Sequence, residues 1–179
     1  MTATDVSASA ISRARREAAD RGLRIDFAVA GMLDLPAGQF DAIICMDNAL
    51  SHFDTQSALI HAATQIRSRL KPGGHFVTSI RDYDHLIEQR PVMQGPSFYP
   101  KRIVHQVWDW QDARRYILHL YLTLETEAGW KALHYTTTYR ALLRAELNAA
   151  LLAAGFTQPA WRMPQETGFY QPIVMCANS

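Results

Sequence analysis

The chain has 179 residues, of which 48% are hydrophobic and 20% charged, as is typical of one globular domain with a substantial core. Its net charge of +1 gives no electrostatic basis for binding nucleic acid, and its arginines are scattered rather than clustered. No apolar stretch approaches the ~20 residues that span a bilayer, so we expect neither a membrane partner nor a nucleic-acid partner.

The cysteines and histidines indicate no metal or disulfide framework. Cys45 and Cys176 lie in apolar runs, which predicts buried free thiols and a cytoplasmic protein. None of the histidines is three or four residues from another, and no CxxC motif accompanies them. No GxSxG elbow or cysteine–histidine signature is present either, so we expect no metal site and no covalent nucleophile.

The first half of the chain alternates strands with helices. Residues 2–5 are β-prone, and Ser7 is placed to cap a helix over about 8–21 that ends at Gly22. "RIDFAVA" (residues 24–30) is the next expected strand. "FDAIICMDN" follows a turn, and its continuous apolar run predicts a strand that is buried on both faces.

A third strand–helix unit completes this half. A helix starts at Asp54 or Thr55 and carries an apolar stripe at core spacing: Leu59, Ala63, Ile66 and Leu70. "KPGG" ends this helix and turns into the strand "HFVTSI". The alternation predicts an α/β fold with a Rossmann-like, mostly parallel, doubly wound sheet.

The pattern changes after residue 90. A loop with three prolines leads to β-type runs over 102–110, 114–126 and 130–140, which predicts an antiparallel β-meander insertion. A helix over about 143–154 and a closing antiparallel strand pair follow. We therefore expect a single domain with a cofactor-site half (1–90), a meander that covers the substrate (91–140) and a C-terminal helix and strand pair (141–179).

Polar residues follow each strand of the expected parallel sheet, and open α/β sheets bind ligands at the carboxyl ends of their strands. The sequence places there Asp5, Gly31, Met32, Met46, Asp47, Asn48, Arg81, Asp82 and Tyr83. Asp5 fits a ribose-binding acid or an acid at a helix start. Arg81 fits a substrate anion or an internal salt bridge to Asp82 or Asp84.

The segments "FDAIICMDNALSHF" and "LKPGGHFVTSIRDYDHLI" resemble the class I S-adenosylmethionine-dependent methyltransferases. Within that family they are most similar to the glycine and sarcosine N-methyltransferases. "KPGG" is common to the whole superfamily. The more specific features are Asn48 with His52, and the R-x-Y-D of Arg81, Tyr83 and Asp84.

The resemblance implies that S-adenosylmethionine is the cofactor and that a small amine is methylated. The cofactor-binding residues it implies are Asp5 for the ribose, Gly31 and Met32 for the adenine, and Met46, Asp47 and His52 for the methionine portion. The substrate-binding residues it implies are Asn48, Arg81, Tyr83, Tyr99 and Tyr121, of which Asn48, Arg81 and Tyr99 form the catalytic set. Asp47 replaces a usual glycine and Asp82 a frequent asparagine, so an acceptor larger than glycine also fits.

The function predicted from the sequence is therefore methylation of the amine of a glycine-like amino acid, by a protein that could form homo-oligomers. The alternatives are a degenerate, non-catalytic module and a nicotinamide-dependent oxidoreductase, which shares the ribose-binding acid. No G-x-G-x-G run is present. We expect an N-terminally truncated fold that lacks its first strand, glycine-rich turn and first helix, with a gap of roughly 10 Å in the sheet.

Overall fold

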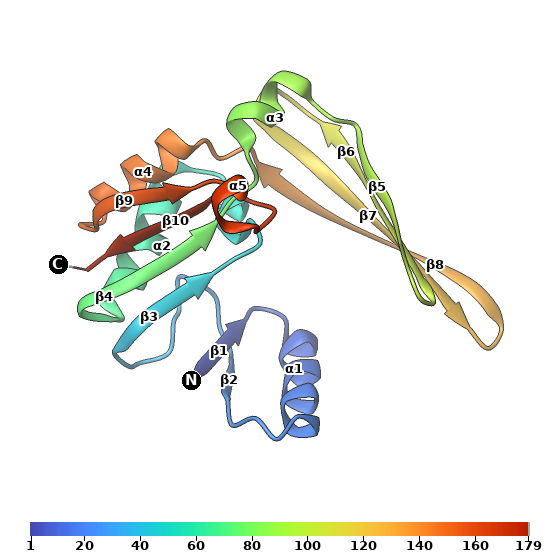
Figure 1. Cartoon of the computed structure of the whole chain (residues 1–179), viewed down its shortest axis with the longest axis horizontal. Coiled ribbons are helices and arrows are strands. Elements are labelled where there is room, and N and C mark those ends of the chain that lie inside the picture. Colours follow the sequence, from blue (N-terminus) through green and yellow to red (C-terminus); the bar gives the residue numbers. More distant parts are fainter. Residues whose placement is uncertain (179) are drawn as a thin grey trace.

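A computed structural model of the chain describes residues 1–178 and contains three separate β-sheets (Figure 1). The first unit consists of β1 (Thr2–Asp5), α1 (Ala8–Asp20) and β2 (Asp26–Val29), with β1 parallel to β2. The hydroxyl of Ser7 accepts a hydrogen bond from the backbone N–H of Ala10 at 3.3 Å, which confirms the predicted cap.

The main sheet has the strand order β3-β4-β10-β9. Its parallel pair is β3 (Phe40–Cys45) and β4 (Leu70–Ser79), and its antiparallel strands are β9 (Thr157–Arg162) and β10 (Ile173–Ala177). The short helix η1 (Ala49–His52) follows β3. The expected closing strand pair is therefore confirmed.

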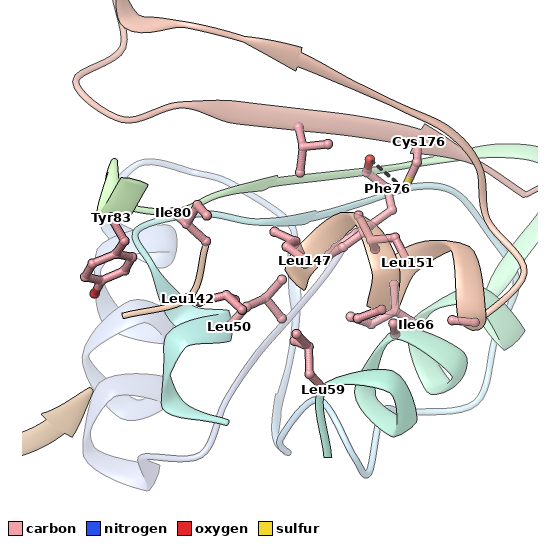
Figure 2. Packing of buried hydrophobic residues seen from close by; sticks show 14 of the residues in the cluster. Leu50, Leu59, Ile66, Phe76, Ile80, Tyr83, Leu142, Leu147, Leu151 and Cys176 are labelled. Atoms are coloured by element: carbon pink, nitrogen blue, oxygen red, sulfur yellow. Dashed lines mark hydrogen bonds between the residues drawn. The ribbon is translucent and has the colours of Figure 1, made fainter. Parts of the chain in front are cut away.

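The core lies between the main sheet and two helices, α2 (Gln56–Ser68) and α4 (Arg144–Ala153). Figure 2 shows Leu147 and Leu151 of α4 near Phe76 of β4, in one cluster with Leu59 and Ile66 of α2 and Cys176 of β10. The predicted stripe is buried, although its last member, Leu70, begins β4 instead of ending α2. Thr55 caps this helix by accepting a hydrogen bond from the N–H of Ala58 at 3.1 Å. Periodic apolar spacing thus placed this part of the core correctly.

The parallel part of the fold is divided between β1 and β3. Within residues 1–178, β1 pairs only with β2 and β3 pairs only with β4, so the two sheets share no strand. Ile44 of β3, which borders this divide, is 67% exposed, so the expectation that this strand is buried on both faces was wrong. The division lies where the sequence predicted a gap.

The third sheet is the meander, which projects away from the main sheet (Figure 1). It consists of β5 (Met93–Tyr99), β6 (Arg102–Trp110), β7 (Arg115–Thr126) and β8 (Gly129–Arg140). Three of its strands were predicted, but the expectation of a loop over residues 93–99 was wrong. β5 is an edge strand with an irregularity between Gln94 and Ser97, a setting in which Pro96 is tolerated.

Two short helices were not predicted from the sequence: α3 (Tyr83–Gln89) and α5 (Pro164–Thr167). Each is too short to show the apolar periodicity that identifies a helix. Among the helices of residues 1–178, none has the length and hydropathy needed to cross a membrane.

A charged cluster joins the meander to α4. Glu146 binds Arg114 and, at 2.7 Å, the Nη2 of Arg140, whose side chain is only 10% exposed. Its carboxylate also accepts the backbone N–H of Leu143 at 2.9 Å. Burial raises the pKa of Glu146, but the Leu143 N–H and the two arginines outweigh it, so the pKa of Glu146 lies below its ordinary value.

Glu146→Gln is expected to lower the free energy of unfolding by about 2 kcal/mol at pH 7, because it leaves a buried arginine without its counter-ion. A carboxyl with a depressed folded-state pKa stabilises the fold above its unfolded pKa of about 4.3, and this contribution is lost as pH falls through the folded value. Urea unfolding of both proteins between pH 7 and pH 3 should show their difference shrinking with acidification. A difference that does not depend on pH would contradict this account.

Candidate functional site

The carboxyl end of β3 has an unusual backbone. Asp47 and Asn48 have φ values of 64° and 66°, so two consecutive non-glycine residues adopt the left-handed conformation. Ser79 of β4 holds this turn, because its Oγ accepts the Asp47 N–H at 2.9 Å and its carbonyl accepts the Asn48 N–H at 3.2 Å. Strained backbone of this kind concentrates at functional sites.

A cavity of about 350 Å³ opens beside this turn, and we call it the Arg81 cavity. It lies between the end of the main sheet and the meander, and polar side chains dominate its wall. The lining residues are Asp47, Arg81, Asp82, Gln94, Gln106, Trp108, Tyr170 and Gln171. Asp47 accepts a hydrogen bond from the Tyr170 hydroxyl, and Gln171 accepts one from the Ser79 hydroxyl at 2.8 Å.

Arg81 is surrounded by neutral groups. Its Nη1 donates to the Tyr116 hydroxyl at 2.6 Å and its Nη2 to Gln106 Oε1 at 3.3 Å. The guanidinium lies 4.7 Å from the ring centroid of Trp108 and 5.1 Å from that of Tyr139, within the range of a cation–π interaction. The interior of the site therefore supplies dipoles and aromatic faces to this cation.

The neighbouring carboxylates bind another arginine. Asp82 Oδ1 is 3.1 Å from Arg144 Nη1, and Asp84 Oδ2 is 3.4 Å from Arg144 Nε. Asp84 also accepts the backbone N–H of Arg144 at 3.1 Å. The internal salt bridge between Arg81 and Asp82 or Asp84, one of the two alternatives raised by the sequence, is therefore not formed.

Asn48 lies beneath the site rather than on its surface, since it is only 1% exposed. Its Oδ1 accepts the hydroxyl of Ser51 at 2.8 Å and the backbone N–H of Arg81 at 3.1 Å. Its Nδ2 donates to the hydroxyl of Tyr83, a fully buried residue, at 2.8 Å. The structure thus brings Asn48, Arg81 and Tyr83 together, with Asn48 and Tyr83 in supporting positions.

Asn48→Ala is expected to lower the free energy of unfolding by about 3 kcal/mol, because it leaves buried donors without partners and puts alanine at a left-handed position. Ser51→Ala, which removes a single hydroxyl of the same group, should cost about 1 kcal/mol. Urea denaturation measures both values. Equal losses in the two variants would show that the Asn48 amide is not the centre of this network.

His52, at the end of η1, packs its ring against Tyr139 with a centroid separation of 4.3 Å and an interplanar angle of 36°. Burial lowers the pKa of His52, and the charge of Arg81 lowers it further, against an opposing hydrogen bond from the imidazole to the Thr138 backbone. The imidazole is therefore neutral at physiological pH. It borders the aromatic surroundings of Arg81.

The remaining predicted cofactor residues lie on both sides of the divide in the sheet. Asp5 is exposed at the end of β1, and its Oδ1 accepts the N–H of Ser7 at 2.7 Å. A Cβ at Gly31 would lie 3.2 Å from a Val6 methyl group, so a larger residue would crowd this turn. Met32 packs against Cys45 of β3, with their sulfur atoms 3.6 Å apart, and Met46 is half-buried beyond that strand.

Asp5 and Asp47 both keep their carboxylates exposed. The exposed carboxylate of Asp5 is free to accept further hydrogen bonds, as a ribose-binding acid must. Gly31 permits close backbone approach after β2, and the turn at Asp47 exposes polar groups at the end of β3, in the other sheet. Asp5 and Gly31 therefore belong to the β1–β2 unit, whereas Met46, Asp47 and His52 follow β3 of the main sheet.

Two predicted tyrosines lie away from the Arg81 cavity. Tyr121 stacks between His105 and His134, at 4.7 and 4.5 Å, on the face of β7 opposite to Tyr116, because residues five apart on a strand point to opposite faces. Tyr99 pairs with Arg102, which is four residues, or about 13 Å, along β6 from Gln106. The structure does not bring either tyrosine to Arg81.

Sequence analysis missed most of the cavity wall. The lining residues it did not select are Gln94, Gln106, Trp108, Tyr170 and Gln171. It also missed Tyr116 and Tyr139, which contact Arg81. In "QVWDW" (residues 106–110) every second residue points to the same face of a strand. This period of two was an available signal that Gln106 and Trp108 share a face. No local pattern marked Tyr170, which reaches Asp47 from a loop more than a hundred residues later.

Comparison with known proteins finds methyltransferases by sequence and by fold. Residues 1–74 match the family described as "Methyltransferase domain". Glycine N-methyltransferase of Rattus norvegicus is 32% identical over 108 residues, covering 58% of this chain and 34% of that protein. Ubiquinone biosynthesis O-methyltransferase of Xanthomonas axonopodis pv. citri is 34% identical over 82 residues, covering 44% and 33%. The chain thus spans about a third of the length of these curated relatives.

Solved structures match nearly the whole chain. An S-adenosylmethionine-dependent methyltransferase from Clostridium acetobutylicum has a TM-score of 0.82 at 15% identity, covering 98% of this chain and 74% of that one. CalS10, an amino pentose methyltransferase from Micromonospora echinaspora, has a TM-score of 0.71 at 19% identity, covering 99% and 73%. The fold is therefore the Rossmann-like methyltransferase fold, meander included.

Fold, sequence family and relatives agree on one class. In sequence over its first half, and in fold over nearly its whole length, the chain is similar to the S-adenosylmethionine-dependent methyltransferases.

Proposed function

We propose that the protein transfers a methyl group from S-adenosylmethionine to the amine of a small molecule that carries a carboxylate, such as a glycine-like amino acid, in the cytoplasm. The observation that carries this proposal is Arg81: a half-buried guanidinium that lines the cavity, while the carboxylates next to it in sequence bind Arg144. Burying a charge is costly without an anion. A carboxylate of the substrate would supply that anion in the bidentate geometry that guanidinium favours.

The cofactor would lie along the sheet edge described above. Asp5 would hold its ribose, Gly31 and Met32 its adenine, and Met46, Asp47 and His52 its methionine portion. When bound, S-adenosylmethionine supplies an electrophilic methyl group on a sulfonium. The protein's own task is alignment, which can account for ~7–11 kcal/mol of a barrier.

Asp47 has a second proposed task at the acceptor amine. The amine must lose its proton to present a lone pair, and Asp47 is a cavity-lining carboxylate that is not engaged by an arginine in the ion pairs described. The Tyr170 hydroxyl donates to it and thereby fixes its position. Asp82 is a weaker choice because Arg144 already binds it.

Calorimetric titration of the chain with S-adenosylhomocysteine, S-adenosylmethionine and NAD tests the cofactor part of the proposal. Transfer of labelled methyl groups to glycine, larger amino acids and their carboxamides tests the acceptor part. We expect binding of the two sulfur nucleosides and transfer to the carboxylates in preference to the amides. Binding of NAD alone would overturn the proposal in favour of an oxidoreductase, although the relatives are methyltransferases.

A non-catalytic module is the second candidate, and the divided sheet favours it. Asp5 belongs to a unit that shares no sheet with the strand bearing Asp47. If the chain binds none of the three compounds in the same titration, the result would support a non-catalytic module.

A further inference from the structure

The support of Arg81 forms a closed hydrogen-bonded circuit. Asn48 Oδ1 accepts the backbone N–H of Arg81 at 3.1 Å, and Asn48 Nδ2 donates to the Tyr83 hydroxyl at 2.8 Å. The Tyr83 and Tyr116 oxygens are 2.7 Å apart, and Tyr116 accepts Nη1 of Arg81 at 2.6 Å. The circuit therefore begins at the backbone of Arg81 and ends at the side chain of the same residue.

The direction of most of these bonds is fixed by chemistry. The backbone N–H of Arg81 can only donate, so the Asn48 oxygen must face it and the Asn48 amide nitrogen must face Tyr83. The Arg81 guanidinium can also only donate, so Tyr116 is its acceptor. Asn48, Tyr83 and Tyr116 are each at most 1% exposed, so water has little access to these groups.

The two phenols carry two hydroxyl protons, and only one of these protons forms a hydrogen bond within the circuit. Each tyrosine oxygen already accepts one bond, from Asn48 or from Arg81, and only one phenolic proton can lie between the two oxygens. The circuit thus has surplus donors. Burial raises the pKa of Tyr116, so its phenol stays neutral and provides no phenolate to balance the guanidinium.

We infer that Asn48, Tyr83 and Tyr116 are positioning residues that hold the Arg81 guanidinium toward the cavity while leaving its charge unneutralised, and that the cavity thereby selects acceptors with an anionic group. This inference rests on the proposed function for its substrate, although the positioning itself does not. An acidic residue in place of Tyr116 would satisfy Arg81 internally. A phenol orients the guanidinium and still requires an anion from the ligand.

Tyr116→Phe is the test, since it removes one oxygen from the circuit and retains the ring that stacks on Trp108 at 4.7 Å. The ratio of kcat/KM for glycine to that for glycinamide is expected to fall at least tenfold, mainly through the KM for glycine. Tyr135→Phe, a matched change at a 54% exposed position of β8, should leave the ratio unchanged. An equal loss with both acceptors would mean that Tyr116 is merely structural and would overturn the inference.

A second measurement does not depend on activity. The Nη1–H resonance of Arg81, assigned by its loss in Arg81→Lys, should exchange slowly with solvent in the unmodified protein and at least tenfold faster in Tyr116→Phe, which removes its acceptor. Unchanged exchange would overturn the positioning role even if methyl transfer is observed. The protein could show slow exchange that Tyr116→Phe abolishes and yet methylate neither acceptor. That result would support the positioning role and would count only against the proposed function.

Discussion

Arg81→Ala is expected to raise the KM for a carboxylate-bearing amine about a hundredfold, with little change in affinity for S-adenosylhomocysteine. Removing one partner of a buried, hydrogen-bonded charge pair costs ~2–5 kcal/mol, and a hundredfold change corresponds to the lower half of that range. Arg81→Lys keeps the charge but loses the planar pair of donors, so it should recover only part of the loss. Steady-state kinetics with varied acceptor concentration provide the measurement.

The matched control is Arg102→Ala on β6. The Arg102 guanidinium lies 4.6 Å from the ring of Tyr99, away from the Arg81 cavity, so the KM for the acceptor should stay within twofold of the original value. Circular dichroism of each variant establishes that the fold is retained. An unchanged KM in folded Arg81→Ala would refute the anion-binding role of Arg81.

Leu151→Ala is expected to lower the free energy of unfolding by ~2–5 kcal/mol, which is a large part of the ~5–15 kcal/mol that stabilises a typical domain. Leu151 is fully buried between the main sheet and α2, where Figure 2 shows it beside Phe76 and Leu147. The truncation removes apolar contacts and leaves a cavity that the surrounding helices cannot fully close.

The neighbouring residue supplies an internal control. Leu152 lies on the same turn of α4 but is 55% exposed, so Leu152→Ala changes the same residue type at nearly the same place without opening a core cavity. Its expected effect is within about 0.5 kcal/mol. Urea unfolding of both variants gives the comparison, and similar losses would show that α4 does not pack as described.

Features that depend on a few neighbouring residues were predictable from the sequence. Ser7 and Thr55 cap helices through hydrogen bonds to residues three positions later, and the stripe of α2 follows from helix geometry. The position of Arg81 after β4 follows from the boundary of an apolar run. Each of these outcomes is decided within about ten residues of chain.

The cavity wall depended on contacts that local patterns do not contain. Tyr121 was selected as a pocket tyrosine, whereas Tyr116 reaches Arg81, and the choice between the two faces of β7 is made by how the meander docks. Tyr170 meets Asp47 across the fold. β5 was missed because Pro96 within it opposes strand formation locally, while pairing with β6 provides the compensating hydrogen bonds.

The divided sheet has a consequence for affinity. In the proposed binding mode one ligand contacts both Asp5 and Asp47. These residues lie in two units that residues 30–39 connect, so the ligand binds two linked sites of the same chain. Its second contact forms at an effective concentration set by that connection rather than by the bulk solution. The length and stiffness of residues 30–39 therefore influence cofactor affinity although they need not touch the cofactor, and tighter binding can be gained by stiffening this connection without changing any contact residue.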